Sequence, residues 1–346
     1  MITGLTIRNF RGFRDMTLDG LARVNLLVGD NGSGKTALLE AIDLAASNTI
    51  LSSLTHRKAR GLPTRTATVE MAMHGDFAGD TGDTTIALRL AGHPDRRFRI
   101  FMDKRQPVPL AALDVADGRT VADAARGQVV FEWKIGDAMQ GTSRFAVAGS
   151  ALGAAPADIP PLPTSYLPPT EVQWPHAASI FSEYVKAGNE SAIVQALAIQ
   201  FPDLSELSLQ LDGSYPMLHA RVARRGPLRP LNAISAGLTK LASMLLMIAQ
   251  PGISLVLIDE IENGLHHARF RLLWQQVRDF AARFDTQVFA TTHSLECLDA
   301  AADAMSKHPE DFAFIRTTRL EDGCTARLLP GADAGHLLRS GLEVRG

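Results

Sequence analysis

A glycine-rich segment near the start of the chain has the residue types and the spacing of a phosphate-binding loop. Its eight residues, which fit the pattern G-x-x-x-x-G-K-[ST], are Gly29, Asp30, Asn31, Gly32, Ser33, Gly34, Lys35 and Thr36. Glycines let the backbone N–H groups of such a loop approach phosphate oxygens closely. The Lys35 side chain adds a positive charge, and the Thr36 hydroxyl can ligate Mg²⁺. The segment therefore predicts a binding site for a nucleotide polyphosphate and its magnesium ion.

The residues on either side of this loop predict the elements that would hold it. Residues 24–28 are apolar except for Asn25 and predict a buried strand, and residues 36–46 carry apolar side chains at helical spacing. A loop between a strand and a helix directs its N–H groups and the helix N-terminus towards a bound anion. This context favours a phosphate site over a glycine-rich turn that binds nothing.

Two carboxylates follow a second buried strand. Residues 253–258 are almost entirely apolar, as expected for a parallel strand buried on both faces, and they end in Asp259 and Glu260. Open α/β sheets bind their ligands at the carboxyl ends of the strands. Asp259 is therefore a candidate Mg²⁺ ligand, and Glu260 is a candidate for polarising a water molecule for in-line attack. The preference of acids for helix N-termini would explain one carboxylate, but not the pairing of both with the loop.

A histidine follows a third apolar strand. Residues 288–292 predict this strand, His293 comes at its end, and Ser294 can cap the next helix. A single histidine at the end of a strand is usually structural. Here it is the third polar group that follows a predicted strand, and we therefore predict that His293 takes part in the chemistry.

The order and content of these motifs resemble the ABC-type ATPase superfamily, most closely its RecF-, SMC- and OLD-like heads. Residues 2–15 look like the first strand and arginine loop of these heads, residues 259–266 resemble the acidic pair and D-loop of compact AAA-type members, and residues 287–300 match the same group. The resemblance implies a P-loop α/β head that binds ATP and Mg²⁺. It also implies that Arg11 contacts the nucleotide and that His293 senses the γ-phosphate.

A degenerate form of the superfamily's signature sequence lies in residues 234–240. The resemblance implies that Ser235 and Gly237 contact the nucleotide of a second subunit. Ser235 is also a good N-cap for the apolar helix predicted over residues 238–249, and one serine can serve both purposes. Family position suggests a Q-loop within residues 165–173, with Gln173 as its candidate residue.

The segments between the motifs predict an antiparallel β flank and a helical second lobe. The predicted flank strands are residues 69–76, 84–91, 97–103, 129–135 and 143–148. The second lobe is predicted to contain a helix over residues 177–200 and a hairpin with strands at 207–211 and 217–223. An Ala-, Gly- and Pro-rich boundary lies at residues 152–169. We expect a single head, with lobe I at about 1–160 plus 252–346 and lobe II at about 161–251.

Composition agrees with a cytoplasmic enzyme. The chain has 346 residues, of which 46% are hydrophobic and 21% charged, and its formal net charge is -2. This nearly neutral net charge gives no indication of nucleic-acid or membrane binding. The two cysteines, Cys297 and Cys324, have no metal-binding spacing. The longest apolar stretch, residues 241–258, is interrupted by Gln-Pro-Gly, and we expect no membrane partner.

The expected function is ATP hydrolysis coupled to the association of two heads into a homodimer. One hypothesis links it to DNA repair or phage defence, because basic clusters near Arg57, Arg97 and Arg224 could bind DNA phosphates. A second hypothesis is a regulatory switch that controls a separate effector without DNA. A transporter ATPase subunit is a third. Fewer than about sixty residues follow His293, too few for a further nuclease domain, so any nuclease is expected to act in trans.

Overall fold

The computed structural model describes residues 1–50, 83–103, 128–146, 157–169, 174–223 and 226–333. Its first eight strands are β1 (Ile2–Phe10), β2 (Phe13–Asp19), β3 (Val24–Val28), β4 (Thr84–Leu90), β5 (Arg96–Asp103), β6 (Gln128–Ile135), β7 (Met139–Ala146) and β8 (Thr164–Leu167). The later strands are β9 (Leu204–Asp212), β10 (Tyr215–Val222), β11 (Leu228–Pro230), β12 (Leu255–Ile258), β13 (Gln287–Thr291), β14 (Phe312–Leu320) and β15 (Gly323–Pro330). The helices are α1 (Lys35–Ala46), α4 (Trp174–Lys186), α5 (Glu190–Gln200), α6 (Leu231–Ile234), α7 (Ala236–Ile248), α8 (Phe270–Arg283) and α9 (Leu295–Met305), with 3-10 turns η4 (His267–Arg269) and η5 (Pro309–Asp311).

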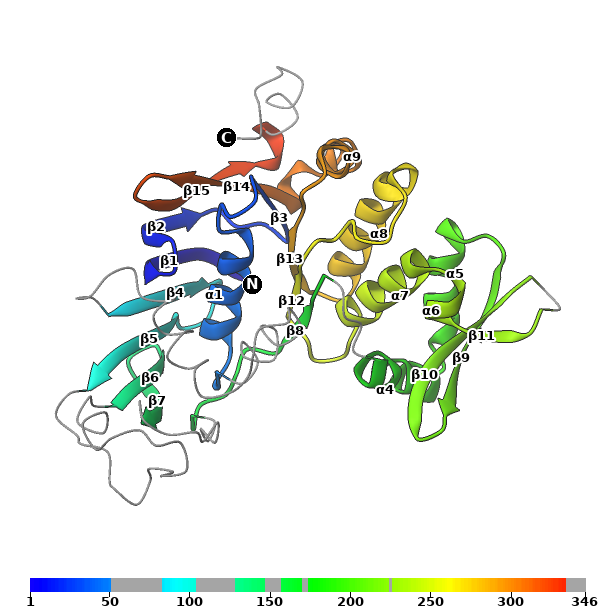
Figure 1. Ribbon diagram of the computed structural model, residues 1–346, viewed down its shortest axis with the longest axis horizontal. Coiled ribbons are helices and arrows are strands. Elements are labelled where there is room, and N and C mark those ends of the chain that lie inside the picture. The colour runs from blue at the N-terminus through cyan, green and yellow to red at the C-terminus, as the bar shows by residue number, and fades with distance from the viewer. Residues whose placement is uncertain (51–82, 104–127, 147–156, 170–173, 224–225, 334–346) are drawn as a thin grey trace, which may run out of the picture.

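One long sheet dominates the described part of the chain (Figure 1). Its twelve strands lie in the order β7-β6-β5-β4-β1-β2-β15-β14-β3-β13-β12-β8. Strands β8, β12, β13, β3 and β14 run parallel to one another. Strands β3, β12 and β13 are buried along their whole length, which explains their nearly continuous apolar sequences. The polar groups that follow these three strands therefore meet at one edge of the sheet.

The predicted β flank continues this same sheet and does not form a sheet of its own. Strand β4 pairs antiparallel with β1, and β5, β6 and β7 follow in turn. Helix α1 is tied to the flank by two hydrogen bonds: Trp133 Nε1 donates to the Leu44 carbonyl at 2.9 Å, and Arg96 Nε donates to the Ala45 carbonyl at 3.1 Å. Strands β4 to β7 account for four of the predicted flank strands, and the fifth, residues 69–76, lies outside the described residues.

Helices and a small sheet occupy the other side of the molecule (Figure 1). The small sheet has the order β11-β10-β9, and its core with α4, α5, α7 and α8 includes the buried side chains of Phe181, Leu197, Leu245 and Trp274. The helix predicted over residues 177–200 is divided into α4 and α5 by a turn in which Gly188 has a φ of 68°. Within the described residues, no helix is both long enough and apolar enough to cross a bilayer.

The segment predicted as a lobe boundary contains a strand that belongs to the main sheet. Strand β8 pairs in parallel with β12, although it lies within the range expected for lobe II. It has only four residues and stands between Pro163 and Pro168, so its sequence pattern is that of a linker. The structure therefore attaches this part of the expected second lobe to the sheet of the first.

Candidate nucleotide-binding site

The glycine-rich loop joins β3 to α1, as its sequence predicts. Gly29, Gly32 and Gly34 have φ values of 144°, 77° and 102°, a region that side chains disfavour. Gly29 also has no room for a side chain, because a Cβ built there would lie 2.2 Å from the Thr317 carbonyl oxygen. The loop residues Gly32, Gly34 and Thr36 line a pocket of about 520 Å³, a volume typical of ligand sites.

Lys35 lies inside this loop with its ammonium on backbone oxygens. Its Nζ donates to the carbonyls of Gly29 at 2.6 Å and Asp30 at 2.9 Å. Burial lowers the pKa of Lys35, while the negative charges of Asp30 and Asp259 act in the opposite direction. A bound polyphosphate would supply the anionic partner that these neutral carbonyls do not.

Thr36 and Asp259 come together although 223 residues separate them in sequence. The Thr36 hydroxyl lies 3.3 Å from Asp259 Oδ1, which also accepts a hydrogen bond from Thr291 Oγ1 at 2.7 Å. Tyr166 places its hydroxyl 3.4 Å from Asp259 Oδ2. A hydroxyl and a carboxylate are hard oxygen donors, so this pair fits the protein's share of an Mg²⁺ site completed by phosphate and water oxygens.

Glu260 lies beside this pair in an unusual backbone conformation, with a φ of 51°. Its N–H donates to Thr291 Oγ1 at 2.8 Å. Its side chain accepts a hydrogen bond from Asn263 Nδ2 at 2.6 Å, and its other carboxylate oxygen lies 3.7 Å from His293 Nε2. The two acidic residues therefore have different surroundings: Asp259 faces the loop helix, and Glu260 lies between the D-loop and the histidine.

Several residues that the sequence motifs did not single out hold this arrangement in place. Thr291 contacts both acidic residues from the end of β13. Lys240 is buried in α7, where its Nζ donates to the carbonyls of Pro168 at 3.1 Å and Asp259 at 3.3 Å. Burial lowers the pKa of Lys240 to about 8. The sequence carries a signal for this role, because a lysine inside a mainly apolar helix needs polar partners when the helix is buried.

The pocket extends to elements on both sides of the loop. Besides loop residues it is lined by His293, by Arg11 of the β1–β2 turn, and by Arg319 of the β14–β15 hairpin. Arg11 is paired with Glu40, a buried carboxylate of α1. The sequence motifs did not include Arg319, because the hairpin lies at the other end of the chain from the loop.

The signature residues lie apart from this pocket in the same chain. Ser235 is the N-cap of α7, and its Oγ accepts a hydrogen bond from the Leu238 N–H at 3.4 Å. Gly237 packs against the D-loop, since a Cβ built there would lie 2.6 Å from the Gly264 carbonyl oxygen. Neither Ser235 nor Gly237 lines the pocket. Gln173, the Q-loop candidate, lies outside the described residues.

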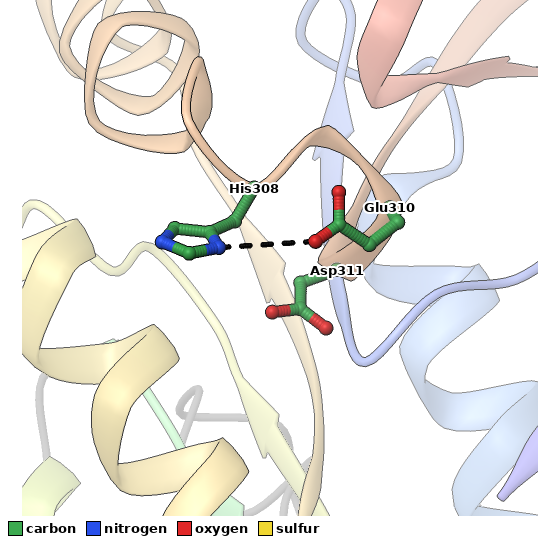
Figure 2. A group of neighbouring side chains, drawn as sticks. All are labelled: His308, Glu310 and Asp311. Carbon is green, nitrogen blue, oxygen red and sulfur yellow. Dashed lines mark ion pairs between the residues drawn. The ribbon is translucent and has the colours of Figure 1, made fainter.

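A separate group of polar side chains gathers on the turn before β14. Figure 2 shows His308, Glu310 and Asp311 pointing towards one another, and His308 Nδ1 lies 3.8 Å from Glu310 Oε1. Strand β14 runs parallel to β3, and the phosphate loop follows β3, so this group lies at the opposite edge of the sheet. It is therefore separate from the nucleotide site.

Two family models match parts of this chain. A model described as "AAA ATPase domain" matches residues 1–92, and one described as "AAA domain, putative AbiEii toxin, Type IV TA system" matches residues 173–299. The DNA replication and repair protein RecF of Yersinia pestis is 30% identical over 125 residues. That alignment covers 36% of this chain and 30% of RecF, so the chain spans less than a third of this relative's length.

Solved structures of SMC heads share the fold. The SmcHead bound to the C-winged helix domain of ScpA has a TM-score of 0.55 and 14% identity, over 96% of this chain and 98% of that one. An Smc head domain derived from Pyrococcus furiosus has a TM-score of 0.51 and 12% identity, over 98% of both chains. The chain therefore has the fold of a P-loop ATPase head and is similar to the ABC-type heads of the RecF/SMC group. The predictions of the family, the α/β fold class and an ATPase are confirmed.

One relative of this ATPase head aligns over nearly its whole length. The ATP/GTP phosphatase of Helicobacter pylori (strain ATCC 700392 / 26695) is 20% identical over 344 residues. The alignment covers 90% of the ATPase head and 90% of the phosphatase. Unlike the RecF match, it therefore includes the segments between the nucleotide-binding motifs.

Proposed function

We propose that this cytoplasmic ATPase head hydrolyses ATP with Mg²⁺ between two associated heads, and that the cycle drives DNA transactions in repair or phage defence. Any nuclease or effector would act in trans. The proposal of ATP hydrolysis rests on the position of Glu260. Its carboxylate lies between Asn263 and His293, and its neighbour Asp259 faces Thr36 of the phosphate loop. Attack by water on a phosphate is assisted by a residue that orients the water or accepts its proton, separate from the group that binds the metal.

In this scheme each side chain has one task. Lys35 would exchange its carbonyl partners for phosphate oxygens. Thr36 and Asp259 would hold an Mg²⁺ ion, which would neutralise charge on the phosphates. Glu260 accepts the proton of the attacking water, and His293 donates a hydrogen bond to the terminal phosphate. The pairing of Glu260 with Asn263 supports this assignment, because the hydrogen bond fixes the direction of the carboxylate.

The second head would supply Ser235 and Gly237 to the nucleotide. Two observations support this. Ser235 caps the N-terminus of α7, a thirteen-residue helix, and helix N-termini favour anions. Gly237 packs on Gly264 of the D-loop, so the signature of one chain lies against the loop that follows its own acidic pair.

Ser235→Arg should prevent ATP-dependent dimerisation while leaving ATP binding to the monomer nearly unchanged. The arginine adds bulk and charge where the partner's phosphate would dock. Light scattering with a slowly hydrolysed ATP analogue measures the dimer, and titration calorimetry measures binding. Ser214→Arg, at an exposed turn residue between β9 and β10, is the matched control.

Mixing Ser235→Arg with Lys35→Ala should restore part of the ATPase activity. In the mixed dimer, one composite site keeps an intact phosphate loop opposite an intact signature. Full activity of monomeric Ser235→Arg would contradict a shared site.

Among the described residues, two arginines of the predicted basic clusters are exposed, Arg97 on β5 and Arg229 on β11. Arg57 and Arg224 lie outside the described residues. Arg99 pairs with Asp83. The similarity to RecF, a DNA replication and repair protein, supports a link to DNA.

Duplex DNA should bind weakly and stimulate ATP turnover, and Arg97→Glu should reduce that stimulation. The effect should fade as salt rises, because phosphate contacts release counterions. ATPase rates with and without DNA, at low and moderate salt, measure this, with GTP as a second substrate. Arg327→Glu, at an exposed position of β15, is the control. ATPase rates that do not change with DNA would contradict a role in DNA transactions. Metal-dependent DNA cleavage by the chain alone would contradict a nuclease that acts in trans.

A regulatory switch that acts on a separate protein is the second candidate. The side chains of Leu211 and Tyr215, at the end of the β9–β10 hairpin, are 73% and 68% exposed, and they offer an apolar surface to a protein partner. One solved SMC head is bound to a winged-helix domain of ScpA. A protein encoded beside this ATPase head that changes its turnover while DNA does not would favour the switch.

A further inference from the structure

The β14–β15 hairpin is attached to the phosphate loop. Thr317 of β14 shares a hydrogen bond with Ser33 Oγ at 2.6 Å, and its hydroxyl lies 3.1 Å from the Val28 carbonyl oxygen. Its own carbonyl occupies the space where a side chain on Gly29 would be. The backbones of Val28 and Gly29 on one side and of Thr317 on the other take part in these contacts. They therefore fix the position of β14 relative to the phosphate loop.

The same hairpin is attached to the arginine loop on its other side. The Cys324 N–H donates to the Gly12 carbonyl at 2.6 Å, and a Cβ built on Gly12 would lie 2.7 Å from Cys324 Sγ. Leu320 pairs with Gly323 across the two-residue turn that joins β14 to β15. The end of the hairpin therefore forms one wall of the nucleotide pocket.

Arg319 extends from this wall over the phosphate loop. Its Nη1 lies 3.3 Å from the position of a Cβ built on Gly32, in the middle of the loop. The residue is exposed, and within the described part of the chain it forms no ion pair. The other two basic side chains of the pocket are engaged, Arg11 with Glu40 and Lys35 with backbone carbonyls. Arg319 is therefore a guanidinium beside the loop that has no anionic partner among the described residues.

We propose that Arg319 binds the polyphosphate of the nucleotide within the same chain. The ligand class is a nucleoside triphosphate, and the inference rests on the proposed function of this pocket. A guanidinium offers several N–H donors in a plane, which suits two phosphate oxygens at once. Because the hairpin is fixed to both the phosphate loop and the arginine loop, Arg319 needs only a side-chain movement to make these contacts.

Binding measurements on two arginine variants test this inference. Arg319→Ala should weaken ATP binding roughly tenfold to a hundredfold, the loss of about one hydrogen bond to a charged group. Inorganic tripolyphosphate should lose affinity by a similar factor, and Arg319→Lys should recover part of both. Arg327→Ala removes an exposed arginine from the same hairpin that does not line the pocket, and it should bind like the wild type. Titration calorimetry gives the affinities, and melting curves check that each variant stays folded.

The outcomes separate this inference from the proposed function. If Lys35→Ala loses ATP while Arg319→Ala binds normally, the pocket binds nucleotide but the inference is wrong. If Arg319→Ala weakens ATP but not tripolyphosphate, Arg319 contacts the base or ribose, and the phosphate assignment is overturned. If the wild type binds neither ligand, both the proposed function and the inference fail.

Discussion

The Lys35→Ala variant should lose tight ATP binding while keeping its fold. The Lys35 ammonium is the positive charge inside the phosphate loop, and it donates hydrogen bonds to the carbonyls of Gly29 and Asp30. Hydrogen bonds to charged groups contribute about 1.5–3 kcal/mol each, so losing two should lower the affinity by roughly a hundredfold or more. Removing the lysine also leaves the negative charge of Asp30 in the loop without this positive neighbour.

Titration calorimetry with a slowly hydrolysed ATP analogue measures this loss. Lys186→Ala, at an exposed lysine of α4, is the matched control and should bind like the wild type. Melting curves distinguish lost binding from unfolding. Wild-type affinity in a folded Lys35→Ala protein would mean that the loop does not bind the nucleotide.

The Glu260→Gln variant should hydrolyse ATP roughly 100- to 10,000-fold more slowly, the usual contribution of a general base. Glutamine keeps the size of the side chain and can still accept the hydrogen bond from Asn263, but it cannot accept a proton from water. ATP binding should persist, because the phosphate loop and the Thr36–Asp259 pair are unchanged. An ATP-bound dimer should therefore accumulate.

Single-turnover kinetics separate the chemical step from binding, and light scattering follows the dimer. His293→Ala should also slow turnover, since its ring lies beside Glu260. Glu310→Gln makes the same substitution at the opposite edge of the sheet and should leave the rate unchanged. A Glu260→Gln protein that turns over at the wild-type rate would place proton transfer on another residue.

The sequence predicted the parts of the site that lie next to apolar strands. The runs before Gly29, Asp259 and His293 are β3, β12 and β13, and parallel pairing brings the ends of these strands to one edge. Strands buried on both faces require nearly continuous apolar sequences, so their position and direction can be read from composition.

Other parts of the site and the fold depend on contacts between residues that are far apart in sequence. Local apolar patterns could not predict them. Thr317 meets Ser33 across 284 residues of sequence, so nothing near the phosphate loop indicates the hairpin that carries Arg319. The predicted flank strands gave no sign that β4 pairs with β1, which makes the flank part of the central sheet. Strand β8 is too short, and too close to prolines, to show a pattern of its own.

The left-handed backbone at Glu260 separates what is good for stability from what is good for activity at a single position. A residue with a side chain in this conformation costs of order 1–3 kcal/mol, and glycine would avoid most of that cost. A screen that selects only for heat resistance would therefore favour glycine at position 260 and remove the proposed base. Engineering a more robust form of this ATPase head should leave this position fixed and seek its gains elsewhere in the fold.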